Sequence, residues 1–351
     1  MLSIIFAEDL ISRVREAINI KEKIAIVSHV GPDGDAIGSS LALWHYLEGL
    51  GKETNIIVPT AFPGFLSWMP GAKNIIVYEH AKAQAQEVLE AADLIFALDF
   101  NTTKRLEKME KAVVNTKAPK ILIDHHLFPE NFAQIIISYP EISSTSELIF
   151  RTICRMGHFE HISLECGQCI LTGMMTDTGG FAYNSNHPEI YTIVAELIKL
   201  GVDKDDIYRK VFNNNSLGRT KLNAFAIYRK MKLFPNNKAA LITITQDELE
   251  RFDYKPGDTE GIVNVPLSID GVIFSVLMRE DTDKIKISFR SQGTFPANKF
   301  AAEIFNGGGH LNAAGGESYT TLKEAVSIFT KALPNYVNYL EISDEDSESN
   351  M

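Results

Sequence analysis

The first half of the chain alternates short apolar segments with segments that have the apolar spacing of a helix. The short segments are rich in Ile, Val and Leu and do not alternate strictly between apolar and polar residues, as is typical of strands covered on both faces. Such alternation predicts an α/β domain with a doubly wound, mostly parallel sheet. The predicted strands are residues 23–28, 55–59, 74–78, 94–98, 120–123 and 134–138, and the predicted helices are residues 36–50, 81–91, 144–156 and 163–175.

The second half of the chain has a different pattern. It is helical from residue 187 to about residue 234, and strand patterns then follow at 239–245, 272–279 and 284–290, the last two as an antiparallel pair. Helices are expected at 298–305 and 322–333. A smaller α/β domain therefore follows a helical connector. The predicted boundaries are 1–190, 191–235, 236–340 and a tail at 341–351.

The chain is acidic, with a formal net charge of −11. This charge argues against a broad basic surface that tracks long duplex nucleic acid, but it is compatible with a short phosphorylated ligand met through a metal ion. Residues 341–351 carry five acidic side chains and no basic one, which predicts a disordered tail. Residues 1–20 have the pattern of an amphipathic helix rather than a signal peptide, and no segment has the roughly 20 apolar residues of a membrane span. We therefore expect a cytoplasmic location.

Two of the three cysteines form the sequence CGQC at residues 166–169. A redox site of this type begins a helix after a strand, and a structural zinc site needs a second pair of ligands. Here the sequence lies within HISLECGQCILTGMM, where apolar residues recur at helical intervals. We interpret these cysteines as buried thiols on a helix face.

The segment SHVGPDGDAIGSS, residues 28–40, joins a predicted strand to a predicted helix. A glycine-bearing turn at such a junction usually binds phosphate through backbone N–H groups and the helix dipole. This turn also carries His29, Asp33 and Asp35, and carboxylates repel phosphate. Either the turn is an acidic surface feature, or a cation lies between the carboxylates and the phosphate.

Polar residues also follow other predicted elements. Asp99 follows the strand at 94–98, Asp124-His125-His126 follows the strand at 120–123, and Asp177 follows the helix at 163–175. Each alone is explained by a turn, a helix cap or a half-buried histidine pair, but a parallel sheet brings its strand ends to one edge. Four carboxylates at one edge would repel one another unless two divalent cations were bound. Oxygen and imidazole ligands suit Mn²⁺ best, Mg²⁺ and Fe²⁺ also fit, and the absence of thiolate argues against structural zinc. The predicted set is His29, Asp33, Asp35, Asp99, His125 and Asp177.

Four segments in this order, HVGPDGDAIGSS, LDFN, DHH and TDTGG, resemble the motifs of the DHH phosphoesterase superfamily. In the second domain, SFRSQG at 288–293 and GGGHLNAAGG at 307–316 resemble the DHH-associated domain of the oligoribonuclease (nanoRNase) and pAp-phosphatase group. The resemblance covers nearly the whole chain apart from the acidic tail. It implies that the active site lies in the cleft between a DHH domain and a DHH-associated domain.

The resemblance also implies roles for single residues. One metal would be bound by His29 and Asp33, the other by Asp35, His125 and Asp177, and Asp99 would bridge both. His126 would face the scissile phosphate, and Asp124 would orient a neighbouring group rather than bind metal. The implied substrate-binding residues are Arg290, Ser291, Gly308, Gly309 and His310, with the guanidinium of Arg290 as a fork for phosphate.

We therefore expect a metal-dependent phosphoesterase that hydrolyses short RNA and linear dinucleotides to 5′-mononucleotides and also removes the 3′-phosphate of pAp. One alternative is a phosphoanhydride hydrolase of the pyrophosphatase or exopolyphosphatase type. However, a substrate without a nucleoside would gain little from contact with the GGGH segment. A RecJ-like single-strand exonuclease is another. A non-catalytic nucleotide sensor or an alanyl-tRNA-editing-like module would be expected to lose a metal ligand, and none is lost. A nicotinamide-binding domain is excluded because the GxGxxG spacing is absent.

Two features stay open at this point. Phe100, directly after Asp99, is either part of the core or a stacking surface for a base. The sequence also leaves the oligomeric state open, a homodimer included.

Overall fold

The chain divides into two compact units, Met1–Asn214 and Asn215–Met351. The computed structural model describes residues 5–336 and 338–339, so the predicted acidic tail lies outside the described residues. Among the described helices, none has both the length and the apolar character needed to cross a membrane.

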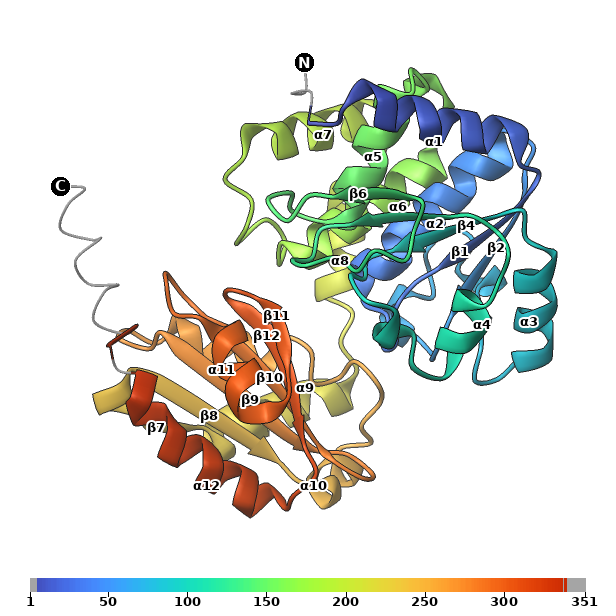
Figure 1. Ribbon diagram of the computed structural model, residues 1–351. Coiled ribbons are helices and arrows are strands. Elements are labelled where there is room, and N and C mark those ends of the chain that lie inside the picture. The colour runs from blue at the N-terminus through green and yellow to red at the C-terminus, as the bar shows by residue number, and fades with distance from the viewer. Residues whose placement is uncertain (1–4, 337, 340–351) are drawn as a thin grey trace. The chain divides into compact units, whose positions relative to one another are not determined.

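Unit 1 is built on a six-stranded parallel sheet with the order β3-β2-β1-β4-β5-β6 (Figure 1). The order reverses between β1 and β4, which are neighbours in the sheet. This is the arrangement of a doubly wound sheet, and it confirms the predicted fold class. The strands are β1 Lys23–Val27, β2 Glu53–Val58, β3 Ile76–Val77, β4 Leu94–Leu98, β5 Lys120–Asp124 and β6 Ile135–Ser138.

Helices cover both faces of this sheet because alternate residues of each strand face opposite sides. In β1, Ile24 and Ile26 join one apolar cluster, whereas Ala25 and Val27 join another. The first cluster contains residues of α1 Glu8–Ile20, α2 Gly34–Gly49, α5 Thr145–Arg155, α6 Leu164–Asp177, α7 Pro188–Lys199 and α8 Lys204–Phe212. The second contains residues of α3 Lys82–Ala91, the 3-10 segment η3 Thr103–Met109 and α4 Glu110–Val114.

Helices α2 and α6 lie in backbone contact. A Cβ atom added at Gly38 would be 2.8 Å from both the carbonyl oxygen of Cys169 and the Cα of Gly173, so only glycine fits there. Asp35 lies in the first turn of α2, and Asp177 is the last residue of α6. The contact between the two helices therefore sets how far apart these two carboxylates lie.

The cysteine prediction is confirmed. Cys166 and Cys169 are fully buried on α6, and burial raises the pKa of both thiols, that of Cys166 to about 12. Such thiols are protonated and unreactive at neutral pH.

The predicted helical connector, residues 191–235, is divided between the two units. Helices α7 and α8 bury their apolar faces in the core of unit 1, and the next helix, α9 Leu217–Phe225, buries Leu222 in unit 2. The predicted helical pattern was also too long, since Lys232–Phe234 form an edge strand, β7, paired antiparallel with Ala239–Leu241. Each of these helices packs its apolar face against the core of one unit, so residues 191–235 do not form a core of their own.

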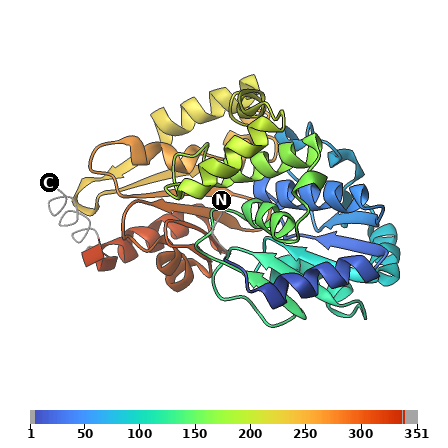
Figure 2. The same cartoon turned by 90° about the horizontal axis from the view of Figure 1, so that it is seen from above.

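Unit 2 contains a six-stranded mixed sheet with the order β11-β12-β10-β9-β8-β7. The predicted antiparallel pairing of the strands near residues 272–279 and 284–290 is confirmed by β9 and β10. Helices α11 and α12 cover one face, and α9 covers the β8–β9 part of the other face, as Figure 2 shows in orange-red and yellow. The elements are β8 Ala239–Ile244, α10 Gln246–Arg251, β9 Phe274–Glu280, β10 Ile285–Ser291, α11 Ala297–Phe305, β11 Gly308–His310, β12 Ala313–Ser318 and α12 Leu322–Ala332.

Candidate active site

The polar residues expected at the sheet edge of unit 1 come together at the carboxyl ends of β1, β4 and β5. This edge includes the point where the strand order reverses, which is the usual ligand position in doubly wound folds. Among the described residues of unit 1, three groups of three residues each place one ligand atom per residue within 4.8 Å of the others. Two consist of predicted metal ligands, His29 with Asp33 and Asp99, and Asp35 with His125 and Asp177; the third is Asp99 with Asp124 and His126.

The second group is the more deeply buried. The Nε2 atom of His125 lies 3.5 Å from Oδ2 of Asp177 and 3.9 Å from Oδ2 of Asp35. The same nitrogen is 3.6 Å from Oδ1 of Asp99, so Asp99 lies beside both groups. On the other side of the ring, Nδ1 of His125 bonds to the carbonyl oxygen of Ile142, which directs Nε2 toward the carboxylates.

Asp35 is held by the N-terminus of α5. Its two carboxylate oxygens accept from the backbone N–H groups of Thr145 at 2.6 Å and Ser146 at 2.9 Å. Despite these bonds, burial raises the pKa of Asp35 well above its ordinary value, and the charges of Asp99 and Asp177 raise it further. A bound cation would therefore strongly stabilise the ionised form of the buried Asp35 carboxylate.

Asp99 has a left-handed backbone conformation, with φ of 65°. Few residues other than glycine adopt it, although Asp and Asn tolerate it best. Oδ1 of Asp99 accepts from the hydroxyl of Thr145 at 2.9 Å. Burial alone would raise the pKa of Asp99, but the imidazoles of His29, His126 and His125 hold it well below its usual range.

His126 is held from two sides. Its Nδ1 atom is 2.7 Å from Oδ1 of Asp124, and its Nε2 atom is 3.0 Å from a guanidinium nitrogen of Arg105. Arg105 and Thr145 could not be predicted from the sequence, because a lone arginine six residues after Asp99 and a threonine in a Ser-Ser-Thr run carry no distinctive signal. Only the fold brings these two residues to the site.

The site fits divalent cations. Nε2 of His29 is buried and has no hydrogen-bond partner among the described residues. Four carboxylates and two imidazoles, without a thiolate, form the ligand set expected for Mn²⁺, Mg²⁺ or Fe²⁺ rather than structural zinc. The edge of the sheet is therefore a candidate metal centre.

Phe100 belongs to the core. It is fully buried in the cluster beneath the sheet and stacks on Phe132, with ring centroids 5.8 Å apart. A side chain in that position is not available to stack on a base.

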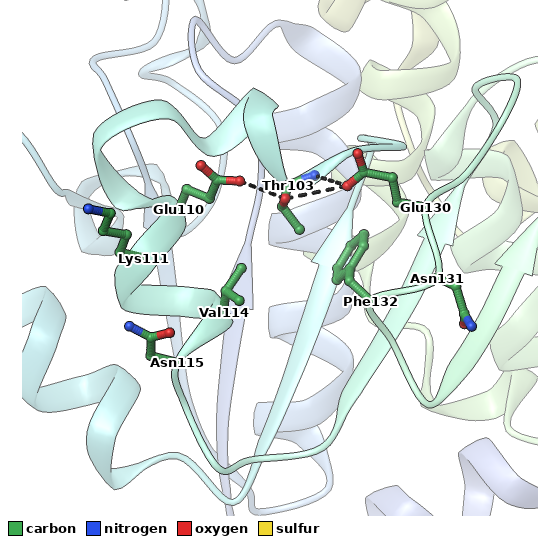
Figure 3. Close-up of a pocket in the computed structure, with 8 residues that line it drawn as sticks. All are labelled: Thr103, Glu110, Lys111, Val114, Asn115, Glu130, Asn131 and Phe132. Atoms are coloured by element: carbon green, nitrogen blue, oxygen red, sulfur yellow. Dashed lines mark hydrogen bonds between the residues drawn. The ribbon is translucent and has the colours of Figure 1, made fainter.

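A surface pocket of about 300 Å³ lies beside this part of the core (Figure 3). Phe132 forms part of its wall, and Glu110 and Glu130 both point toward Thr103. The Thr103 hydroxyl donates to Glu110 at 2.7 Å, and its backbone N–H donates to Glu130 at 2.9 Å. These bonds tie the segment after Asp99 to the segment after His126.

In unit 2, the predicted substrate residues lie on β10 and β11, the two strands that flank β12 in the sheet. Arg290 of β10 and His310 of β11 both pair with Ala313 of β12, so all three side chains are on the same face of the sheet. In the adjacent row on that face, Ser288 and Gly308 both pair with Gly315. This face of the sheet therefore carries small residues next to an arginine and a histidine.

The three glycines of GGGH differ in their surroundings. A Cβ atom at Gly307 or Gly309 would lie 2.8 Å or 2.7 Å from backbone carbon of β12, whereas a Cβ at Gly308 would meet nothing within 4 Å. Two of the glycines therefore allow the β11–β12 pairing, and Gly308 leaves open space on the exposed face.

Ser291 has its hydrogen bonds inside the unit. Its hydroxyl donates to the carbonyl oxygen of Phe295 at 2.7 Å and accepts from the side chain of Asn312 at 2.9 Å. It supports the turn after β10, and this geometry offers less support for substrate contact than that of Arg290 or His310.

Comparisons with known proteins identify the class of protein to which the chain belongs. A model described as the DHH family, N-terminal domain, matches residues 23–174, and a DHHA1 domain model matches residues 237–338. The chain is similar to the bifunctional oligoribonuclease and PAP phosphatase NrnA of Thermus thermophilus, with 28% identity over 87% of this chain and 86% of that protein. These findings make the chain a phosphoesterase hydrolase.

Two solved structures are similar to this chain over almost its whole length. An exopolyphosphatase-related protein from Bacteroides fragilis is 54% identical, with a TM-score of 0.93 over 97% of this chain and 100% of that chain. RecJ from Thermus thermophilus, at 14% identity and a TM-score of 0.52 over 96% of this chain and 54% of that chain, shares the fold. The protein belongs to the DHH phosphoesterase family and carries a C-terminal DHHA1 domain.

Proposed function

We propose that the protein is a two-metal phosphodiesterase that hydrolyses short RNA and linear dinucleotides to 5′-mononucleotides and also removes the 3′-phosphate of pAp. The observation that carries the proposal is the pair of ligand groups that meet at Asp99. Such a pair is the arrangement that two-metal hydrolysis of phosphate esters needs. The similarity to NrnA supports the choice of oligonucleotides and pAp as substrates.

The metal ligands in this proposal are His29 and Asp33 on one side, Asp35, His125 and Asp177 on the other, and Asp99 between them. Two divalent ions, most readily Mn²⁺, would activate water and neutralise charge on the phosphate. The chain's own residues fix the geometry, since α5 orients the Asp35 carboxylate through Thr145 and Ser146. His126 is the residue proposed to act at the leaving oxygen, with Asp124 orienting its ring.

The substrate side is proposed to be the open face of unit 2. Arg290 would hold a phosphate, while His310 and the space above Gly308 would take the sugar or base. A phosphoanhydride hydrolase is the second candidate, because the Bacteroides fragilis relative is described as exopolyphosphatase-related. A cytoplasmic location and a homodimer stay predictions.

The test is a parallel time course with Mn²⁺ on an RNA dinucleotide, a five-mer, a long single strand, pAp, pyrophosphate and polyphosphate. Rapid cleavage of the shortest RNAs together with pAp would support the proposal. Activity confined to pyrophosphate or polyphosphate would favour the second candidate, and processive loss of the long strand would indicate a RecJ-like exonuclease.

Replacing Arg290 with Ala is expected to raise KM for an RNA dinucleotide about tenfold or more, because a charge-assisted bond to phosphate is lost. The metal content should not change, since Arg290 lies in unit 2 and the ligands lie in unit 1. The control is Lys323→Ala, an exposed cation on α12. Loss of metal from the Arg290 variant would contradict a role confined to the substrate.

The glycines of β11 give a second, internal comparison. Gly308→Ala should leave thermal stability within about 0.5 kcal/mol, because the added methyl group points into open space. It should raise KM, because the methyl group would fill space that the proposal gives to the sugar or base of the substrate. Gly309→Ala should lower stability by roughly 1–3 kcal/mol, because φ is +141° and the methyl group meets β12. Thermal melts and dinucleotide kinetics measure both effects, and an unchanged KM for Gly308→Ala would remove the open face from the binding model.

A further inference from the structure

Arg105 is a half-buried cation at the edge of the candidate metal centre. Its guanidinium donates to Nε2 of His126 over 3.0 Å. Within the described part of the chain, no carboxylate forms an ion pair with Arg105. The side chain is therefore held toward the histidine without a structural ion pair of its own.

The opposite ring nitrogen of His126 faces Asp124, a fully buried carboxylate at the end of β5. A guanidinium only donates hydrogen bonds and a carboxylate only accepts them. The two bonds together therefore assign the hydrogen of His126 to Nδ1 and leave Nε2 as the acceptor. One neutral tautomer satisfies both partners.

The backbone around Arg105 is fixed to the loops that carry the site. Its carbonyl oxygen accepts from the N–H of Val30, the residue after His29, at 2.8 Å. Two residues earlier, Thr103 is tied to Glu110 and Glu130, as the dashed lines in Figure 3 show. The guanidinium thus extends from a segment that is bonded both to the His29 loop and to the segment after His126.

We propose that Arg105 is a positioning residue, which acts on the reaction through His126 by holding its ring, with Asp124, in one orientation and one tautomer. The inference rests on the proposed function, since it concerns the residue assigned to the leaving oxygen. Removal of the guanidinium takes away one of the two contacts that orient the ring and leaves Nε2 without its donor, while Asp124 and the metal ligands keep their contacts.

The first test compares Arg105→Met, which keeps an apolar stem and removes the donors, with Lys104→Met, which removes an exposed cation one residue earlier. Arg105→Met is expected to lower kcat on an RNA dinucleotide about 10- to 100-fold, with KM changed less than about threefold and bound metal per chain unchanged. Lys104→Met should stay within about twofold in both constants. A large rise in KM in Arg105→Met would overturn the proposal, because it would mean direct binding of substrate.

The second test is a double-mutant cycle with His126→Ala. If Arg105 acts through His126, Arg105→Met has no further effect once the imidazole is absent. If the two losses multiply, Arg105 acts independently and the proposal fails. If His126→Ala is itself fully active, the proposed role of His126 fails, whatever Arg105 does.

A third readout needs no activity. ¹⁵N NMR of histidine-labelled protein should show one protonated Nδ1 and one unprotonated Nε2 for His126, identified by their absence in His126→Ala. In folded Arg105→Met the Nε2 signal should shift, because this atom has lost its hydrogen-bond donor, while Nδ1 still bonds to Asp124. Unchanged signals would overturn the proposal even if the enzyme hydrolysed none of the substrates tested.

Discussion

Replacing Asp99 with Asn is expected to lower kcat on RNA dinucleotides at least 10³-fold, which corresponds to about 4 kcal/mol of lost transition-state stabilisation. Asp99 is the carboxylate that lies beside both ligand groups, 3.5 Å from His29 and 3.6 Å from His125. Asn is the informative substitution, because it tolerates the left-handed backbone of this position and still accepts from Thr145. The fold should therefore persist while the bridging charge disappears.

Asp93→Asn is the matched control, because Asp93 directly precedes β4 and Asp99 directly follows it. Its carboxylate accepts from the backbone N–H groups of Glu22 and Lys23, away from the ligand groups, so kcat should stay within about twofold. Steady-state kinetics and metal analysis of both variants decide the matter. An Asp99→Asn enzyme that kept activity within about tenfold, or ~1.4 kcal/mol, would show that the bridging role is wrong.

Removing metal should reverse the way in which stability depends on pH. Burial would lower the pKa of His125, but the carboxylates of Asp177, Asp99 and Asp35 raise it to about 9, above the 6.5 of an unperturbed histidine. Between these values the folded, metal-free protein holds a proton that the unfolded chain has released. Stability is therefore fully present below about pH 6.5 and is lost as the pH rises through 9, by roughly 3 kcal/mol in total.

The raised pKa of Asp35 also makes the metal-free protein less stable as the pH rises, but this loss begins at a lower pH. The lowered pKa of Asp99 affects stability only in strong acid. Metal binding has the opposite dependence, because a divalent ion needs the unprotonated imidazole of His125. Thermal unfolding in EDTA and in excess Mn²⁺, between about pH 6.5 and 9, should therefore give melting temperatures that diverge as the pH rises. His125→Asn should flatten the curve measured in EDTA, and parallel curves for the wild-type protein would contradict a metal site at these residues.

The sequence predicted the strands of unit 1 well, because buried parallel strands consist almost wholly of apolar residues. It also indicated His29, Asp99 and the histidine pair, since Asp99 and His125 directly follow such strands and His29 follows β1 after one residue. The residues that hold these side chains were not predictable. Arg105, Thr145 and Ser146 reach the site through η3 and α5, and nothing in a single sequence shows which strand end a helix terminus will approach.

Two errors in unit 2 have a similar origin. The strand β11, Gly308–His310, consists mostly of glycine, which has low intrinsic strand propensity, and it exists because it pairs with β12. Lys232–Phe234 continue a helical apolar pattern and yet pair with β8. In both places tertiary pairing overrides local preference.

The backbone contact between α2 and α6 has a consequence for altering the enzyme. Asp35 and Asp177 are spaced by the distance between two helix axes, and Gly38 and Gly173 keep those axes together. Exchanging ligand side chains alone leaves this spacing as it is. An engineer who wants the centre to prefer a larger ion has to widen the helix crossing itself, and a methyl group at Gly38, about one helical turn after Asp35, would press on Cys169 and Gly173 of α6.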